Sequence, residues 1–300
     1  MKKKETLHEK HIPSLSRVFT PVVMDSLSQT GTSGYLKEVM NNSGLINQLN
    51  SSMPLKDFFD WVYAFLFKNY RNEYIYKNVI ANKILLGKHS LNTSHMLTEF
   101  RAGKCKADVV VLNGTSTVYE IKSEFDSFVR LENQIQSYLA IFDYINVITS
   151  ASQANKLKSI LPEKAGILVL TDRNTITTIR DATANKKNIN PNILFDSLRK
   201  IEYLKIIREY FRFVPDVPNT RIYKECRALF CKIPPETAHD LTIKVLQNRC
   251  KNNTLKQFMD AAPSSLSAYA MSICNEKKKL QALAAIFSKR IDSVLFPEFI

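Results

Sequence analysis

The spacing of apolar residues changes along the chain and divides it into regions of different expected structure. Within residues 1–70, apolar side chains recur at three and four positions, most clearly in residues 54–69, where Pro54 occupies the first turn of an amphipathic segment. Residues 71–86 continue with the same period. The pattern therefore predicts a helical N-terminal region and one further helix that ends near Gly87.

Between residues 95 and 123 the period of apolar positions shortens to two, which is typical of strands. Three short strands are predicted, at residues 95–101, 106–112 and 117–123, and Asn113 and Gly114 supply a tight turn between the last two. The pattern continues with a helix over residues 127–142, a strand at 144–149, a second helix and a strand at 166–171. This order of elements predicts an α/β fold.

The distribution of glycine and proline indicates a second change of architecture. All seven glycines lie at or before Gly166, whereas prolines continue to Pro297, so the last third is predicted to be helical with turns at the prolines. Residues 181–192 are polar and have the composition of a linker or an exposed loop. The sequence thus predicts a helical cap (1–70), an α/β core (71–190) and a helical C-terminal domain (191–300).

Composition narrows the class of protein. With 300 residues, 45% of them hydrophobic, the chain can bury a sizeable core. The longest run of large apolar residues, 61–67, is far shorter than the ~20 residues that cross a bilayer, and the N-terminus lacks the apolar segment of a secretory signal. Five irregularly spaced cysteines indicate reduced thiols rather than a disulfide framework or a zinc site. We expect a cytoplasmic protein with no membrane partner.

The net charge of +14 suits a polyanionic partner, because lysines and arginines that neutralise phosphates release counterions. Nucleic acid is the partner that this charge favours. The excess is spread over the chain, and many soluble proteins are basic without binding nucleic acid. Charge alone therefore leaves both interpretations open.

One group of charged residues lies in the predicted strands. Asp108 and Glu120 are symmetric about Gly114, so a hairpin closed by a three-residue loop would place them directly opposite one another. Lys122 is two residues beyond Glu120, and the period of a strand turns both side chains to the same face. Two carboxylates and an ammonium group are therefore expected on one patch.

Charged groups among apolar strand residues need a compensating interaction, because an unpaired buried charge is costly. A divalent cation is one explanation, since Mg²⁺ takes carboxylates together with water and substrate phosphate. The other explanation is a buried carboxylate that pairs with Lys122 and has no catalytic role. Spacing alone leaves both open.

The surrounding sequence resembles the PD-(D/E)XK nuclease superfamily. K-A-D-V-V-V-L around Asp108, followed by V-Y-E-I-K with Glu120 and Lys122, is similar to the D…(D/E)xK signature, with Ala107 in place of the proline. Glu73, on the preceding helix, stands where that family has its first acidic residue. The resemblance covers residues 71–150 and implies a restriction-endonuclease-like core of order αβββαβ, with a mixed sheet flanked by helices.

The helix that follows the strands extends this resemblance. Gln134 and Tyr138 are similar to the QxxxY element of exonuclease-like branches, and residues four apart share one face of a helix. Arg130 extends the same row towards phosphate. The run from R-N-E-Y through A-N-K-I-L-L-G-K-H-S to T-E-F-R-A-G-K resembles a bacterial family of small standalone proteins with no firmly established substrate.

The resemblance implies a role for each residue of the site. Asp108, Glu120 and the backbone carbonyl of Ile121 would hold Mg²⁺ (or Mn²⁺), and Glu73 would orient its water shell or complete a second site. Lys122 would position the attacking water and offset charge on the phosphate. Gln134 and Tyr138 would steady Lys122 or the phosphate.

We therefore expect a Mg²⁺-dependent deoxyribonuclease that hydrolyses phosphodiester bonds, with a role in defence against phage or mobile DNA. The alternative is a non-catalytic nucleic-acid-binding or scaffold module that retains the fold. In either case the helical flanks could contact a second copy of the chain or another protein.

Four other signals carry less weight. His89 and His95 are close enough in sequence to act as acid, base or ligand, but an isolated histidine beside a strand is more often a surface or hydrogen-bonded residue. Glu99 could replace Glu73 as the auxiliary carboxylate, although Glu73 is favoured. The lysines at 277–279 are expected to be solvated, and the aromatic stripe at 203–213 to be core packing.

Overall fold

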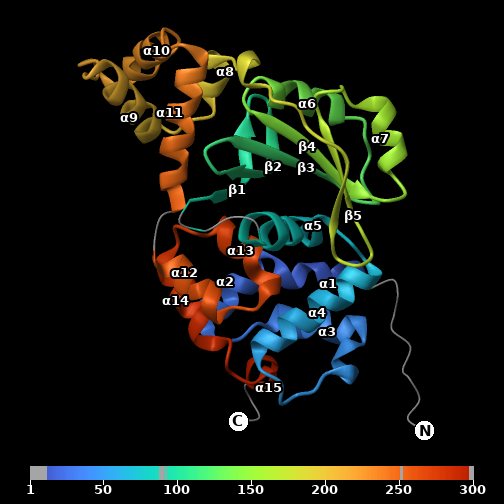
Figure 1. Cartoon of the computed structure of the whole chain (residues 1–300). Helices are drawn as coiled ribbons and strands as arrows, with labels where there is room; N and C mark the ends of the chain where they lie inside the picture. Colours follow the sequence, from blue (N-terminus) through green and yellow to red (C-terminus); the bar gives the residue numbers. More distant parts are fainter. Residues whose placement is uncertain (1–11, 88–90, 92, 251–252, 297–300) are drawn as a thin grey trace. The chain divides into compact units, whose positions relative to one another are not determined.

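The computed structural model describes residues 12–87, 91, 93–250 and 253–296, so the first eleven residues, considered above for a secretory signal, lie outside it. The fold is mixed α/β, with a six-stranded sheet flanked by helices (Figure 1). The chain divides into two compact units: a helical unit, Met1–Asn82 with Asn252–Ile300, and a sheet unit, Lys83–Lys251. In the described ranges, helices fall short of the length and apolar character that a membrane span requires.

The helical unit is formed by both ends of the chain. Its N-terminal helices are α1 (Ile12–Leu15), α2 (Pro21–Thr30), α3 (Gly34–Ser43), α4 (Leu55–Asn69) and α5 (Glu73–Val79), with 3₁₀ turns η2 (Ser16–Phe19) and η3 (Leu45–Gln48). Its C-terminal helices are α12 (Asn253–Ala261), α13 (Ser267–Ser272), α14 (Lys277–Ile286) and α15 (Ile291–Leu295), with the 3₁₀ turn η7 (Ser264–Leu266). The predicted helix at residues 54–69 is confirmed as α4, and that at 71–86 as α5 followed by the π-helical turn η4 (Ile80–Leu86).

Hydrogen bonds join α5 to the C-terminal helices. The amide of the fully buried Asn78 donates to the carbonyl of Ser264 over 3.0 Å and accepts from the backbone N–H of Ala268 over 3.0 Å. Tyr74 donates its hydroxyl to the carbonyl of Ser265 over 2.7 Å. These bonds satisfy buried polar groups that would otherwise be costly. They explain why residues after 252 belong with the N-terminal helices.

The sheet of the other unit runs in the order β1-β2-β3-β4-β5-β6. Its strands are β1 (His95–Ala102), β2 (Cys105–Leu112), β3 (Ser116–Lys122), β4 (Tyr144–Ser150), β5 (Gly166–Leu170) and β6 (Ile176–Arg180). β1, β2 and β3 are antiparallel neighbours, β3, β4 and β5 are parallel, and β6 is antiparallel to β5. The five predicted strands are confirmed, and the edge strand β6 was not predicted.

The β2–β3 hairpin has the predicted register. Val109 pairs with Tyr119 and Leu112 with Ser116, so a three-residue loop closes it around Gly114. Gly114 has a φ of 91°, in a region that residues with a side chain rarely adopt. The glycine therefore sets the turn, and the turn sets which residues of β2 and β3 face each other.

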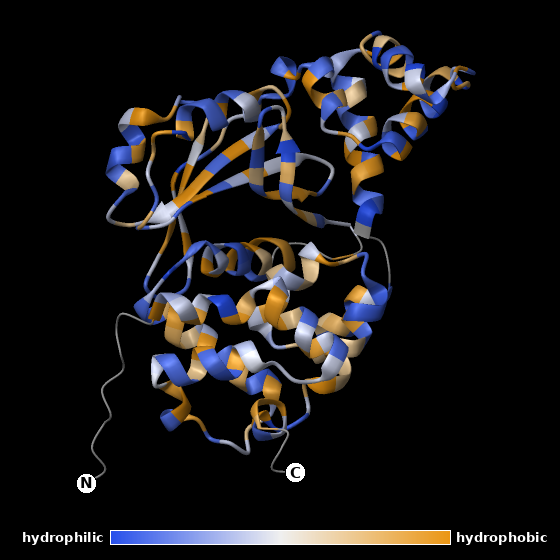
Figure 2. Ribbon diagram, turned by 180° about the vertical axis from the view of Figure 1, so that it is seen from behind, coloured by the Kyte–Doolittle hydropathy of each residue, from blue (hydrophilic) through white to orange (hydrophobic). Residues whose placement is uncertain are grey.

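The helices of the sheet unit are α6 (Leu131–Leu139), α7 (Ala154–Ile160), α8 (Pro191–Asp196), α9 (Lys200–Phe211), α10 (Asn219–Phe230) and α11 (Pro235–Gln247), with 3₁₀ turns η5 (Lys186–Asn188) and η6 (Asn248–Cys250). α6 and α7 connect parallel strands and lie along one side of the sheet (Figure 1). Figure 2 shows hydrophobic segments along the strands and on the helices, and nearly all residues of β3, β4 and β5 are buried. The sheet is thus the apolar centre of this unit.

Helix α6 begins later than the predicted residue 127. The carboxylate of Asp126 accepts hydrogen bonds from the backbone N–H and the hydroxyl of Ser123, over 2.8 and 2.6 Å. These bonds hold the chain in a turn directly after β3. The helix therefore starts only at Leu131.

Residues 181–192, expected as a linker or loop, are held against the end of α6. The amide of the buried Asn185 donates to the carbonyls of Leu139 and Phe142, over 2.6 and 3.0 Å. Residues 191–251 consequently belong to the sheet unit and residues 252–300 to the helical unit. This division differs from the three segments that the sequence predicts, because hydrogen bonds between distant segments decide it.

The cysteines differ from the expectation of five reduced thiols. Cys105, Cys226 and Cys231 are free, but Cys274 is disulfide-bonded. The expectation is therefore wrong for Cys274, because spacing in the sequence does not report which thiols meet in space.

Candidate active site

Glu120 and Lys122 form an ion pair at the end of β3. Lys122 donates from Nζ to Oε1 of Glu120 over 2.9 Å and to Oε1 of Gln134 over 3.0 Å. Glu120 is 1% exposed and Lys122 is 8% exposed. The period of two along β3 thus turns both side chains to one place, as predicted.

Two side chains of α6 complete this arrangement. Gln134 donates from Nε2 to Oε1 of Glu120, and Tyr138, one turn later, donates its hydroxyl to Oε2 of Glu120 over 2.6 Å. The amide of Gln134 therefore bonds to both charged groups, accepting from Lys122 and donating to Glu120. We call Glu120, Lys122, Gln134 and Tyr138 the Glu120 network.

The Tyr138 hydroxyl also lies 2.9 Å from the carbonyl oxygen of Lys106 on β2. A phenol has one proton, so it donates to either Glu120 or Lys106 at a given moment. Burial first, and the nearby carboxylate of Glu120 second, raise the pKa of Tyr138 well above its usual value of 10. Tyr138 therefore remains a proton donor in the physiological range of pH.

Asp108 lies on β2, and the register that pairs Val109 with Tyr119, continued by one residue, sets it across from Glu120. Its Oδ2 accepts a hydrogen bond from the backbone N–H of Ile121 over 2.8 Å. Asp108 is half-buried, in contrast to the buried Glu120. The predicted proximity of Asp108 to the end of β3 is confirmed, whereas the role of the Ile121 carbonyl as a ligand stays a prediction.

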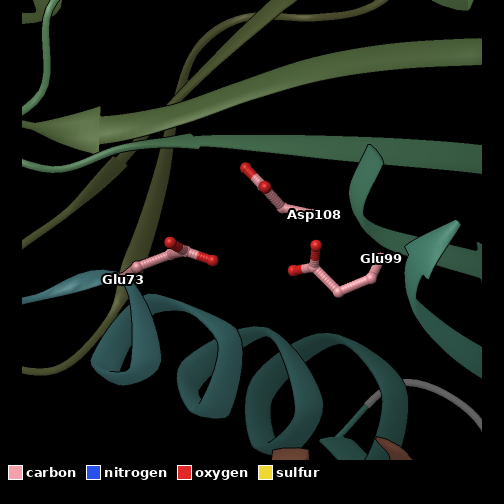
Figure 3. A group of neighbouring side chains, drawn as sticks. All are labelled: Glu73, Glu99 and Asp108. Atoms are coloured by element: carbon pink, nitrogen blue, oxygen red, sulfur yellow. The ribbon is translucent and has the colours of Figure 1, made fainter. Parts of the chain in front are cut away.

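Glu99, on β1, brings a second carboxylate to Asp108. The register of β1 with β2 places it beside Asp108, between the Thr98–Val109 and Phe100–Ala107 pairs. Carboxylate oxygens of Glu99 and Asp108 lie within 4.8 Å of one another, and Figure 3 shows both side chains. The sheet unit thus supplies two neighbouring carboxylates by itself.

The backbone of Glu99 has a φ of 52°, in the left-handed region. For a residue with a side chain this conformation costs of the order of 1 kcal/mol or more, and such residues are frequent at functional sites. Glu99 falls between two pairs of the β1–β2 ladder and is itself unpaired in it. The strain accompanies the approach of its carboxylate to Asp108.

Glu73, the favoured auxiliary carboxylate, lies in the first turn of α5 and belongs to the helical unit (Figure 3). Its carboxylate forms an ion pair with Lys77, one turn later on the same helix, over 2.6 Å. Glu73 is exposed. Its contribution to the site stays a prediction.

The structure also places the residues that the sequence analysis treated as weaker signals. His89 lies outside the described residues, and His95 is buried at the start of β1, where it pairs with Leu112. In the aromatic stripe, Tyr203 is buried as expected, but Tyr210 and Phe213 are exposed. Lys279 forms an ion pair with Asp25 and is therefore not simply solvated.

Two basic residues near the site were missed by the sequence analysis. Lys104 and Lys106 line a cavity that Gln134 also lines. The signal that could have identified them is the short run Gly103 to Lys106, which carries two lysines within four residues before Asp108.

A serine, a histidine and an aspartate meet elsewhere in the sheet unit. The Ser116 hydroxyl lies 2.9 Å from Nε2 of His239, and Asp143 accepts from the backbone N–H of Ser116 over 2.8 Å. All three are buried, so a substrate cannot reach the hydroxyl. This cluster joins α11 to the sheet and does not form a nucleophilic centre.

The fold and site define a mixed α/β protein with a Glu–Lys pair at the end of a central strand. The family model for bacteriophage P4 protein cII matches residues 67–273, which is more than half of the chain, so the protein belongs to that family. Protein cII of Enterobacteria phage P4 is 20% identical over 148 residues, which cover 48% of this chain and 54% of that protein. The match therefore spans about half the length of this relative.

Among solved structures, a protein of unknown function from Silicibacter pomeroyi is similar to part of the chain. The match covers 42% of this chain and 87% of that protein, at 19% identity and a TM-score of 0.28. At this TM-score the match does not establish a shared fold.

Proposed function

We propose that this protein is a metal-dependent nuclease of the PD-(D/E)XK type that hydrolyses phosphodiester bonds of DNA. The observation that carries the proposal is the Glu120 network, with Asp108 across from it on β2. The order α5, β1, β2, β3, α6, β4 supports it, because it matches the αβββαβ order that the sequence resemblance implies.

The donor set near Asp108 fits a hard divalent cation. Asp108 and Glu99 offer carboxylate oxygens within 4.8 Å of one another, and Mg²⁺ and Mn²⁺ prefer oxygen ligands. Glu120 already accepts hydrogen bonds from Lys122, Gln134 and Tyr138. Glu99 is exposed and Asp108 is half-buried, so they are more accessible as ligands than the buried Glu120. The resemblance implies that Glu120, the carbonyl of Ile121 and Glu73 complete the set.

When bound, Mg²⁺ or Mn²⁺ would lower the pKa of a coordinated water and polarise the phosphate. The protein contributes the orientation of Lys122. Within the described part of the chain, Glu120 and Gln134 use two of the three N–H donors of its ammonium group, which leaves one for a substrate oxygen. Lys122 can then offset negative charge that develops on the phosphate during attack.

This proposal is tested by incubating the purified protein with plasmid, linear duplex, single-stranded DNA and RNA. We expect cleavage of DNA with Mg²⁺ or Mn²⁺, and none after addition of EDTA or in the Asp108→Asn variant. A folded wild-type protein that binds metal but cleaves no substrate would exclude the proposal.

A second candidate is a nucleic-acid-binding or scaffold module without catalysis. The observation that favours it is the burial of Glu120, whose two oxygens are both engaged by protein donors. In that case the affinity for nucleic acid should be equal in EDTA and in Mg²⁺ and unchanged by Asp108→Ala. A requirement for metal in binding would count against this candidate.

The proposed cellular role is defence against phage or mobile DNA. It follows from the resemblance to small standalone bacterial nucleases. Plating a phage panel on cells that carry the wild-type or the Glu120→Ala gene tests the role. Equal plaque counts throughout would exclude it for those phages.

A further inference from the structure

A basic cavity lies beside the Glu120 network in the sheet unit. It has a volume of about 810 Å³ and lies between the start of β2 and the exposed side of α6. Lys104, Lys106 and Arg130 contribute the charged groups of its lining, and Asn133, Gln134 and Gln136 contribute amides. We call this cavity the basic pocket.

The charge of the basic pocket is not neutralised locally. Its lining contains three cationic side chains and no carboxylate. Lys104, Lys106 and Arg130 are exposed, and none of them forms an ion pair with another residue of the described ranges. Cations and amide N–H donors around one cavity are the groups that bind phosphate oxygens in nucleic-acid interfaces.

Gln134 connects the basic pocket to the Glu120 network. Gln134 lines the pocket, and its side-chain amide bonds to both Lys122 and Glu120. Contacts between β2 and α6 fix the two sides of the pocket relative to each other. One of them joins the Cys105 sulfur to the Ser137 hydroxyl over 3.5 Å. An anion in the pocket would therefore lie one side chain away from the lysine that is proposed to meet the scissile phosphate.

We infer that the basic pocket binds backbone phosphates of a nucleic acid strand through Lys104, Lys106 and Arg130, adjacent to the phosphate at the Glu120 network. This inference deepens the proposed function and rests on it for the identity of the neighbouring phosphate. Lys104 and Lys106 at the start of β2 and Arg130 at the start of α6 line one cavity, and such cations bind the sugar-phosphate backbone without reading the bases. The pocket thus positions the strand, and it does so without metal.

The inference is tested by measuring the binding of a fluorescently labelled oligonucleotide in EDTA. Fluorescence anisotropy reports the affinity at salt concentrations from about 50 to 200 mM. The test variant is Lys104→Ala with Lys106→Ala and Arg130→Ala. The matched control is Lys158→Ala with Lys164→Ala and Arg173→Ala, which removes the same charge from exposed positions of the same unit outside the pocket. DNA and RNA oligonucleotides are measured in parallel.

The slope of log affinity against log salt should become shallower by about 2 for single-stranded DNA in the pocket variant, at roughly 0.7 per lost phosphate contact. The control variant should keep the wild-type slope and affinity. Because the substituted residues are exposed, thermal melting of both variants should match the wild type. A pocket variant with the wild-type slope, or a wild-type protein that binds neither DNA nor RNA, would overturn the inference.

The same measurements separate this inference from the nuclease proposal. If binding depends on the basic pocket and no cleavage occurs in Mg²⁺ or Mn²⁺, the inferred phosphate-binding role of the pocket is supported and the nuclease proposal is excluded. If the wild type cleaves DNA and the pocket variant binds as tightly as the wild type, the nuclease proposal stands and the phosphate-binding role of the pocket is excluded.

Discussion

The ammonium group of Lys122 lies 2.9 Å from a carboxylate oxygen of Glu120, two residues earlier on the same strand, and both side chains are buried. A buried ion pair is weak support for stability, because desolvation offsets much of its Coulomb energy. Gln134 bonds to both partners and so holds the ammonium in one orientation. A lysine held in one orientation by Glu120 and Gln134 is an arrangement that chemistry needs more than folding does.

We predict that Lys122→Ala lowers turnover by about 10² to 10³, with little change in substrate affinity, because its charge meets negative charge that grows only during attack. If Lys122 served only as the partner of Glu120, its removal would instead cost about 3 to 5 kcal/mol of stability. Thermal melting beside cleavage rates separates the two roles. A large drop in melting temperature, with activity retained in the folded fraction, would identify a structural pair.

We predict that Asp108→Asn and Glu99→Gln both weaken metal binding, because their carboxylates lie within 4.8 Å of each other. Isothermal titration with Mn²⁺ should show lower affinity in each variant, and extra Mn²⁺ should partly restore cleavage. The same titration on Glu73→Gln tests the metal-binding role that the resemblance implies for this residue. A wild-type titration curve for Glu99→Gln would show that its position beside Asp108 has no role in metal binding.

We predict that Tyr138→Phe lowers the free energy of unfolding by about 1 to 3 kcal/mol, because one oxygen of the buried Glu120 loses a donor. Urea unfolding measures the change. Tyr144→Phe is the matched control, since Tyr144 lies on β4 of the same sheet and its hydroxyl makes no hydrogen bond to the described residues. Equal stability of the two variants would show that the hydroxyl of Tyr138 does not support Glu120.

We predict that acid destabilises the sheet unit through His239. Burial lowers the pKa of this histidine below its usual value of 6.5, although Asp143 and Asp240 oppose the shift and Lys186 adds to it. Below pH 6.5 the unfolded chain therefore takes up a proton that the folded protein does not. Stability should fall as pH decreases through 6.5 and level off below the folded pKa.

The slope of this dependence should not exceed about 1.4 kcal/mol per pH unit, which is the limit for one proton. Unfolding free energies of the wild type and His239→Gln over the range from neutral to mildly acidic pH measure it. The variant should be less stable at neutral pH but should lose less stability on acidification. The same acid response in both proteins would assign the effect to other groups.

Parts of the fold and the site could be predicted from local sequence. The symmetry of Asp108 and Glu120 about Gly114 predicted the hairpin register that the Val109–Tyr119 pair confirms. The spacing of two predicted the contact between Glu120 and Lys122, and the spacing of four placed Gln134 and Tyr138 on one face of α6. The edge strand β6 was missed because its exposed positions do not alternate between apolar and polar residues.

The sequence by itself determined the features that depend on backbone geometry: the strand and helix periods, the turn at Gly114 and the side chains that each element turns to one face. Only the tertiary structure decided which distant segments meet. It joined Ser264 and Ala268 to α5 through Asn78, and it brought the carboxylate of Glu99, whose backbone is left-handed, to Asp108. These contacts depend on the burial and pairing of polar groups far apart in the chain, and no local period encodes them.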